Sequence, residues 1–250
     1  MTDVLYTLGP DSGHDNQELR WSLRSVAMFG RNVGRVIVAG YPPDWLSDEV
    51  VRFPVERPEG LRKDAVIFHN VMSAIDAGVV SWTFLLSSDD HFLTAPCDFD
   101  ATPLWAREKD GAPVSIPPYA NGRGGNDYRL VLDQTRRVLL AAGYGIAKTN
   151  PHRNTVIDYR LAPELKRLRD AAPDKSVGIE INCAMGNLRH DVMGVPFRLM
   201  KDWKVRHLRT DAVAAGAFSI RDAAFDDPAF VAYMGSLFRE PCVYERKDMQ

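Results

Sequence analysis

Residues 82–91 read Trp-Thr-Phe-Leu-Leu-Ser-Ser-Asp-Asp-His, an apolar run that ends in two adjacent carboxylates and an imidazole. A strand inside a parallel sheet is covered on both faces, so this continuous apolar run predicts a buried strand. Ligands of open α/β sheets bind just beyond the carboxyl ends of such strands. Asp89 and Asp90 are therefore expected at a ligand site, although paired aspartates are also a common way to leave a strand through a turn.

The two carboxylates also indicate the kind of ligand. Mg²⁺ and Mn²⁺ prefer oxygen ligands, usually keep several waters and are often shared with substrate phosphates. We therefore predict that Asp89 and Asp90 bind Mn²⁺ or Mg²⁺. A transferase that uses a nucleotide sugar or a sugar phosphate is the first hypothesis for the function.

The rest of the chain alternates between strand-like and helix-like patterns. Strands are expected over 3–8, 35–40, 50–55 and 82–86, and helices over 19–27, 61–77, 128–142 and 161–171. Residues 202–206 and 218–220 are expected to form a short strand pair. This order is typical of an α/β protein with a doubly wound sheet. We predict one catalytic domain over 1–250, in which 1–93 bind the nucleotide sugar and 94–250 bind the acceptor.

Composition limits the classes of partner. The 31 basic and 33 acidic residues give a net charge of -2, so no overall field draws the chain to nucleic acid or to a membrane surface. We find no signal segment and no apolar run long enough to span a bilayer, and expect no stable membrane insertion. The three cysteines lack Cys-x-x-Cys spacing, which favours reduced thiols in the cytoplasm over zinc ligands or disulfides.

Two polar positions in the second half are candidate catalytic groups. His152 lies in the polar stretch 148–154 and is expected as a third metal ligand or a proton shuttle, with a capping or surface role as the alternative. Glu180 follows the strand-like residues 177–179 and is a candidate base for the acceptor hydroxyl, with helix capping as its alternative. The segment 121–126 is rich in glycine but lacks the order of phosphate-binding loops, so we expect an acceptor loop there.

Several blocks of the sequence resemble the Stealth proteins, a family of sugar-phosphate transferases. The most specific are Glu18-Leu-Arg-Trp-Ser-Leu-Arg-Ser25 and Phe84-Leu-Leu-Ser-Ser-Asp-Asp90. Weaker similarity covers 3–7, 43–46, 151–153, 218–222 and 238–241. Ser88 stands where that family often has Asn, and the chain is shorter than many members.

The resemblance implies a GT-A-like nucleotide-diphosphosugar transferase fold. It also implies that Asp89 and Asp90 bind the metal, that Arg20 and Arg24 lie near the donor phosphates, and that His152 is catalytic. Arg20 and Arg24 lie four residues apart and so share a helical face, although pairing with Glu18 and Asp15 is an equal alternative. The full set predicted to contact the nucleotide sugar is Thr7, Leu8, Gly9, Arg20, Arg24, Lys63, Asn70 and Ser88. The predicted catalytic set is His152, Glu180 and Asp90.

We thus expect a metal-dependent glycosyltransferase that moves a sugar from a UDP- or GDP-type donor to the hydroxyl of a glycan, a lipid-linked sugar or a modified DNA base. Transfer of a hexose 1-phosphate, as in Stealth proteins, is the first alternative. A nucleic-acid role would use the locally basic stretch between Arg123 and Arg169. A non-catalytic nucleotide-sugar binder and a sugar-nucleotide hydrolase are the remaining alternatives.

Overall fold

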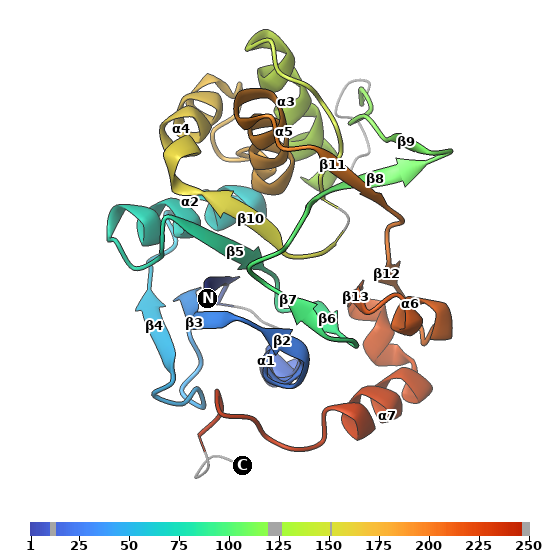
Figure 1. Cartoon of the computed structure of the whole chain (residues 1–250). Coiled ribbons are helices and arrows are strands. Elements are labelled where there is room, and N and C mark those ends of the chain that lie inside the picture. The colour runs from blue at the N-terminus through green and yellow to red at the C-terminus, as the bar shows by residue number, and fades with distance from the viewer. Residues whose placement is uncertain (11–13, 120–126, 151, 247–250) are drawn as a thin grey trace.

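The computed structural model describes residues 1–10, 14–119, 127–150 and 152–246. It has a mixed α/β fold built on a five-stranded sheet in the order β10-β5-β1-β3-β4 (Figure 1). β1, β3, β4 and β5 pair in parallel, whereas β10 runs antiparallel to β5. The strands span Thr2–Leu8 (β1), Val33–Gly40 (β3), Val50–Pro54 (β4), Thr83–Ser87 (β5) and Thr155–Asp158 (β10).

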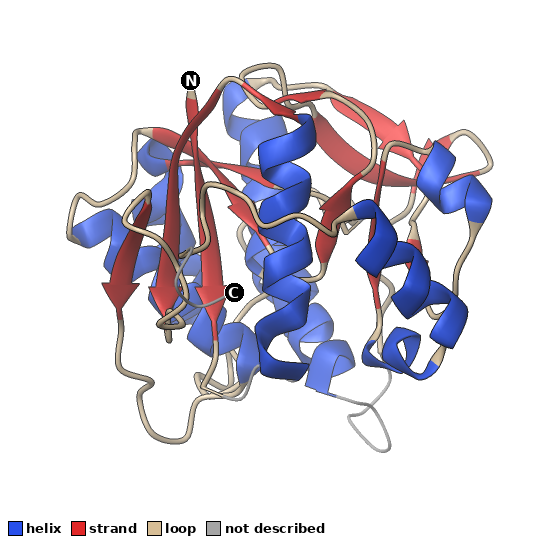
Figure 2. Ribbon diagram, turned by 90° about the horizontal axis from the view of Figure 1, so that it is seen from below, coloured by secondary structure: helices blue, strands red, loops and turns tan. Residues whose placement is uncertain are grey.

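Both faces of this sheet are buried. Successive side chains of a strand point to opposite faces, so Tyr6 packs in one hydrophobic cluster with α1 (Gln17–Phe29), and its neighbour Leu5 packs in another. Figure 2 shows helices on both sides of the strands. The helices that contribute to the cluster around Leu5 are α2 (Lys63–Asp76), α3 (Asp127–Ala141), α4 (Ala162–Ala171) and α5 (Ile181–Met193).

Short strands extend the fold beyond the main sheet. β6 (His91–Leu93), β13 (Ala217–Ile220) and β12 (Lys204–Val205) form one three-stranded sheet. β8 (Leu104–Lys109), β9 (Ala112–Pro113) and β11 (Phe197–Met200) form another, and β2 (Gly30–Arg31) pairs with β7 (Cys97–Asp98). The remaining helices are α6 (Thr210–Ala214), α7 (Pro228–Leu237) and the short 3-10 helices His14–Asn16, Tyr159–Leu161 and Asp222–Asp226.

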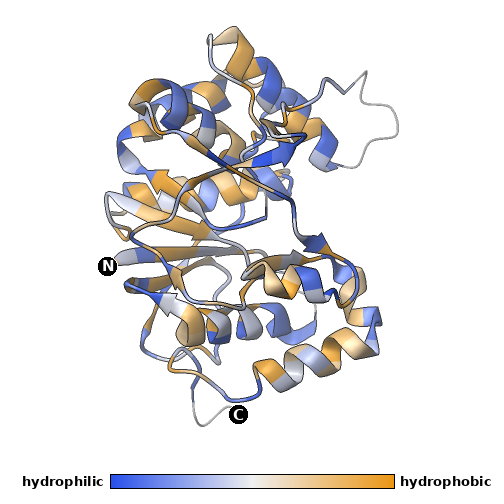
Figure 3. Cartoon of the chain, turned by 45° about the vertical axis from the view of Figure 1, so that its right-hand side comes forward, coloured by the Kyte–Doolittle hydropathy of each residue, from blue (hydrophilic) through white to orange (hydrophobic). Residues whose placement is uncertain are grey.

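A third hydrophobic cluster holds the β6–β13 sheet against α1 and α7. Phe92 and Phe218 pack with their ring centroids 5.5 Å apart, and Trp21 of α1 lies edge-on to Phe230 of α7 at 6.2 Å. Figure 3 shows α7 as a helix of hydrophobic and intermediate residues. Among the described helices, none has the length and apolar character needed to cross a bilayer.

Most of the expected elements are confirmed to within a few residues, including β12 and β13 as a strand pair. The strand-like interpretation of residues 177–179 is wrong. Gly178 has φ of +76°, which breaks an extended run, and Glu180 caps a helix that begins at Ile181. The apolar residues around Gly178 are buried against helices, and a run this short does not distinguish a strand from a buried loop.

Candidate functional site

The carboxyl edge of the main sheet brings together segments from both halves of the chain. β1 is central, with β3 and β4 on one side and β5 and β10 on the other, so the order of strands reverses between β1 and β5. Such a reversal is where open α/β sheets hold ligands. Because β10 is antiparallel, the residues that lead into it arrive at this same edge. Ser87 at the end of β5 donates a hydrogen bond of 3.0 Å to the side-chain oxygen of Asn154.

The predicted nucleotide-binding residues Thr7, Leu8 and Gly9 lie at the end of β1. Leu8 is buried, its carbonyl accepts a 3.3 Å hydrogen bond from the Tyr41 backbone N–H, and Gly9 is exposed. A Cβ added to Gly40 at the end of β3 would lie 2.2 Å from the Leu8 carbonyl oxygen, and Gly40 has φ of +98°. Only glycine permits this close approach of the two strand ends.

Asp89 and Asp90 form the turn that leads from β5 into β6. Asp89 Oδ1 accepts a 3.1 Å hydrogen bond from the Asp90 backbone N–H, which fixes the turn. Lys204 Nζ of β12 lies 2.9 Å from Asp90 Oδ2, and His91 Nε2 lies 3.7 Å from Asp90 Oδ1. The Asp90 side chain is 17% exposed, so the pair faces neither open solvent nor the core. Ser88 precedes the pair and is half-buried.

Negative charge accumulates around this turn. Burial and the nearby Asp89 and Asp90 carboxylates raise the pKa of Glu18, in the first turn of α1, to about 8. Burial and Asp90 likewise raise the pKa of Asp89 to about 6. Burial alone would raise the pKa of Asp90, but His91 and Lys204 bring it below its ordinary value.

Lys63 supplies positive charge near the acidic turn. It stands exposed at the first position of α2, and Asp89 and Asp90 raise the pKa of its ammonium against the opposing effect of desolvation. Asn70, two turns further along α2, is in contrast only 2% exposed, and its side-chain oxygen has no hydrogen-bond partner. The structure therefore brings Lys63 to the acidic turn and leaves Asn70 in the interior, beneath Gly40.

The donor set fits a cation that is shared with a substrate. In the part of the chain that the structure describes, no three His, Cys, Asp or Glu side chains are grouped as a complete metal-binding set. Asp89 and Asp90 offer carboxylate oxygens for only part of a coordination shell. Mg²⁺ and Mn²⁺ commonly complete theirs with water and phosphate oxygens, and a cation here would relieve the repulsion that Glu18 experiences.

His152 is held by a carboxylate that the sequence did not single out as a site residue. Its Nδ1 lies 2.6 Å from Asp202 Oδ1, and Asp202 Oδ2 lies 2.6 Å from Arg107 Nη1. Because a carboxylate only accepts, Nδ1 carries the proton, which leaves the Nε2 lone pair available. Arg107 Nη2 also lies 3.1 Å from Nδ1, but two donors form no hydrogen bond, and the guanidinium charge instead disfavours protonation of the ring.

Two further properties support a functional role for His152. Its backbone φ is +54°, in the left-handed region that residues other than glycine rarely adopt, and such conformations gather at functional sites. Burial lowers the pKa of the imidazole below its ordinary value, although Asp202 opposes this effect. At neutral pH, His152 is therefore an uncharged imidazole whose free nitrogen can take up a proton or bind a metal.

Glu180, the other predicted base, is engaged inside the protein. It is 3% exposed and caps α5 through a 2.6 Å hydrogen bond from the Cys183 backbone N–H. The side-chain amides of Asn150 and Asn182 donate to its Oε1 at 2.9 and 2.8 Å. The structure thus assigns Glu180 the alternative role of helix capping, because these three donors occupy its carboxylate.

Arg20 and Arg24 share a face of α1 as expected, and the anion that they bind is the carboxylate of Glu245 in the same chain. Arg24 donates hydrogen bonds to the Glu245 carboxylate from Nε and Nη2 at 2.6 and 2.7 Å, and Arg20 donates one from Nη1 at 2.9 Å. Arg20 also stacks on Trp45, with 4.0 Å between the guanidinium carbon and the ring centroid. Glu245 is fully buried, so this triad anchors the C-terminal segment on α1.

We expect Glu245→Gln to lower the free energy of unfolding by about 3 kcal/mol at pH 7, because it leaves two largely buried guanidiniums without a counter-charge. Urea denaturation measures this loss. Arg24 lowers the pKa of Glu245 against burial, so the wild-type advantage is complete above the ordinary glutamate pKa and shrinks as the pH falls through the folded value. Glu240→Gln, at an exposed glutamate, should leave stability unchanged. Equal stability of the two variants would contradict the anchoring role.

The locally basic stretch is mostly neutralised by nearby acids. The ion pairs are Arg137–Asp133, Arg160–Asp158, Lys166–Asp76, Arg167–Glu164 and Arg169–Asp170. No observation among the described residues therefore favours a nucleic-acid partner. The predicted acceptor loop 121–126 lies outside the described residues.

Sequence reasoning missed Glu18 and Asp202 as site residues. A glutamate in the first turn of a helix is ordinary, so Glu18 gave no signal until the fold placed it beside Asp89.

Comparison with models of known protein families finds no match to this chain, and no curated protein matches it.

Proposed function

We propose that this protein is a metal-dependent glycosyltransferase with a GT-A-like fold, which moves a sugar from a nucleotide-diphosphate sugar to an acceptor hydroxyl. The observation that carries the proposal is the meeting of Asp89, Asp90 and Lys63 beyond the point where the strand order reverses. A diphosphate needs a cation, a positive side chain and close backbone approach, and this edge offers groups suited to each. The resemblance of two sequence blocks to Stealth proteins supports the same substrate class.

The donor would lie across the ends of β1 and β5. Gly9 is exposed and Ser88 is half-buried at these strand ends, and Lys63 would bind the phosphates of the nucleotide as a point charge. Asp89 and Asp90 would hold Mn²⁺ or Mg²⁺, which when bound stabilises the charge that grows on the leaving diphosphate. Lys204 holds Asp90 in its ionised form.

His152 is suited to act on the acceptor. Its Nε2 would take the proton of the attacking hydroxyl, while Asp202 holds the ring and stabilises the imidazolium that forms. Arg107 in turn fixes Asp202. We further expect the reaction to run in the cytoplasm, where Cys97, Cys183 and Cys242 would remain the free thiols that the structure shows.

A thermal-shift screen of UDP- and GDP-sugars with and without Mn²⁺ tests the donor half of the proposal. A ligand that binds only the folded state stabilises it, and a hundredfold excess over Kd should raise Tm by about 5 °C. We expect one donor class to do so only with Mn²⁺. If no nucleotide sugar raises Tm under either condition, the proposal fails. Product masses with the stabilising donor then show whether a glycosyl group or a hexose phosphate is transferred.

A further inference from the structure

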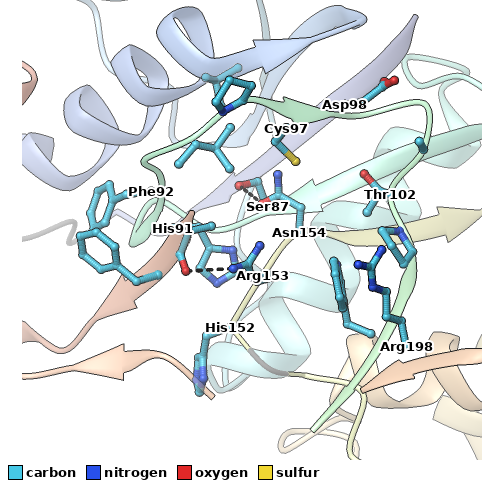
Figure 4. A pocket seen from close by; sticks show the side chains of 18 residues that line it. Ser87, His91, Phe92, Cys97, Asp98, Thr102, His152, Arg153, Asn154 and Arg198 are labelled. Carbon is cyan, nitrogen blue, oxygen red and sulfur yellow. Dashed lines mark hydrogen bonds between the residues drawn. The ribbon is translucent and has the colours of Figure 1, made fainter. Parts of the chain in front are cut away.

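A cavity of about 230 Å³ lies next to the candidate site (Figure 4). Its walls are largely apolar, and the largest side chains in them are those of Phe92, Trp105 and Phe218. The cavity is also lined by Ser87, His91 and His152. These residues lie between the cavity and the acidic turn. A molecule bound here would therefore lie beside the proposed general base.

Arg153 places an uncompensated charge in this cavity. Its Nη2 donates to the backbone oxygens of Ala215 and Ala217 at 2.8 and 3.2 Å, while its buried Nε has no hydrogen-bond partner. Within the described part of the chain, no carboxylate acts on its guanidinium. A partly buried cation without a counter-charge is costly, which indicates that a ligand supplies the missing anion.

Trp105 joins Arg153 to a second cation. The guanidinium carbons of Arg153 and Arg198 lie 5.5 and 5.4 Å from the Trp105 ring centroid. Figure 4 shows Arg153 near His91 and Asn154, and Arg198 farther from His91. An indole held by two guanidiniums gives an apolar wall bordered by positive charge. This combination suits a ligand with an apolar body and an anionic group.

We propose that this cavity binds a small organic acid, with its carboxylate at Arg153 and Arg198 and its apolar part against Trp105. We assign the cavity as the acceptor subsite, and this assignment rests on the proposed function. The acceptor is then an organic acid that carries a hydroxyl group, and this hydroxyl faces His152. The carboxylate would complete the hydrogen bonding of Arg153 Nε, which no described protein group does. The apolar walls would exclude strongly hydrated inorganic anions.

Benzoate and its neutral isostere benzamide are suitable probes, titrated into the full chain without metal or nucleotide sugar. The indole N–H resonance of Trp105, identified by its loss in Trp105→Phe, reports binding by NMR. We expect benzoate to shift this resonance and to bind at least about tenfold more tightly than benzamide. An unmoved resonance, or equal affinities for the two probes, would overturn the proposal.

Two arginine variants and one control locate the anion. Arg198→Met removes an exposed side chain and keeps the fold, so it should weaken the binding of benzoate about tenfold. Arg153→Met also loses two hydrogen bonds to backbone oxygens and serves as a second measurement. Arg239→Met, at an exposed arginine far from Trp105 in sequence, should leave the affinity unchanged. Equal affinity of Arg198→Met and Arg239→Met would contradict the assignment.

A final titration separates this proposal from the donor proposal. With Mn²⁺ and a stabilising nucleotide sugar present, benzoate should still bind, because acceptor and donor subsites are filled together. Mutual exclusion would place benzoate at the donor and overturn the acceptor assignment. Donor stabilisation without benzoate binding would refute only the cavity proposal. Benzoate binding without donor stabilisation would refute the transferase proposal and with it the acceptor role of the cavity, but not the organic-acid site itself.

Discussion

Asp90→Asn is expected to remove the Mn²⁺-dependent part of donor stabilisation and to lower kcat/KM for transfer by about 1000-fold. The substitution keeps the shape of the side chain but removes the charge that would bind the cation and balance Lys204. Loss of one electrostatic group at a site of growing negative charge commonly has an effect of this size. Thermal shift and initial rates on the purified variant measure the two quantities separately.

The matched control is Asp48→Asn, which removes the same charge from an exposed position. It should retain both the Mn²⁺-dependent shift and the rate. Circular dichroism of Asp90→Asn without ligands checks that the fold is kept. If Asp90→Asn shows the full Mn²⁺-dependent shift, Asp90 does not hold the cation and the metal assignment fails.

Local patterns were sufficient to predict β1, β3, β4 and β5 of the main sheet and the place of the acidic turn, but not β10. The apolar run 83–87 and the helical spacing of 17–29 each reflect burial that is decided within one segment. The rule that ligands bind beyond strand ends then placed Asp89 and Asp90 without knowledge of the strand order. These features could be predicted because they depend on neighbours in the sequence.

The partners of charged groups could not be predicted in the same way. Arg20 and Arg24 carry the spacing of an anion-binding pair, but their anion is Glu245, which lies 225 and 221 residues further along the chain. Asp202 meets His152 across 50 residues because β12 joins β13 beside β6. One sequence shows which groups need partners, and only the fold shows which partner each receives.

The pairing of His152 with Asp202 leads to the second large effect that we expect. His152→Gln should lower kcat for transfer by about 1000-fold with little change in donor KM, because it removes the base and leaves the phosphate-binding groups in place. In the wild-type protein, kcat/KM should fall as the pH drops through the His152 pKa, which burial places below its ordinary value. The pH profile and the separation of kcat from KM measure both effects.

Asp202→Asn tests whether the carboxylate positions the imidazole. It no longer requires the proton on Nδ1, so the base is lost in part of the molecules, and kcat should fall by about 100-fold or more. Asp202 also raises the His152 pKa, so the acid limb of the residual activity should move to lower pH. Replacement of the exposed His207 by Gln should change neither quantity. A lower kcat with an unmoved acid limb would make Asp202 merely structural, and an unchanged kcat in His152→Gln would exclude His152 as the base.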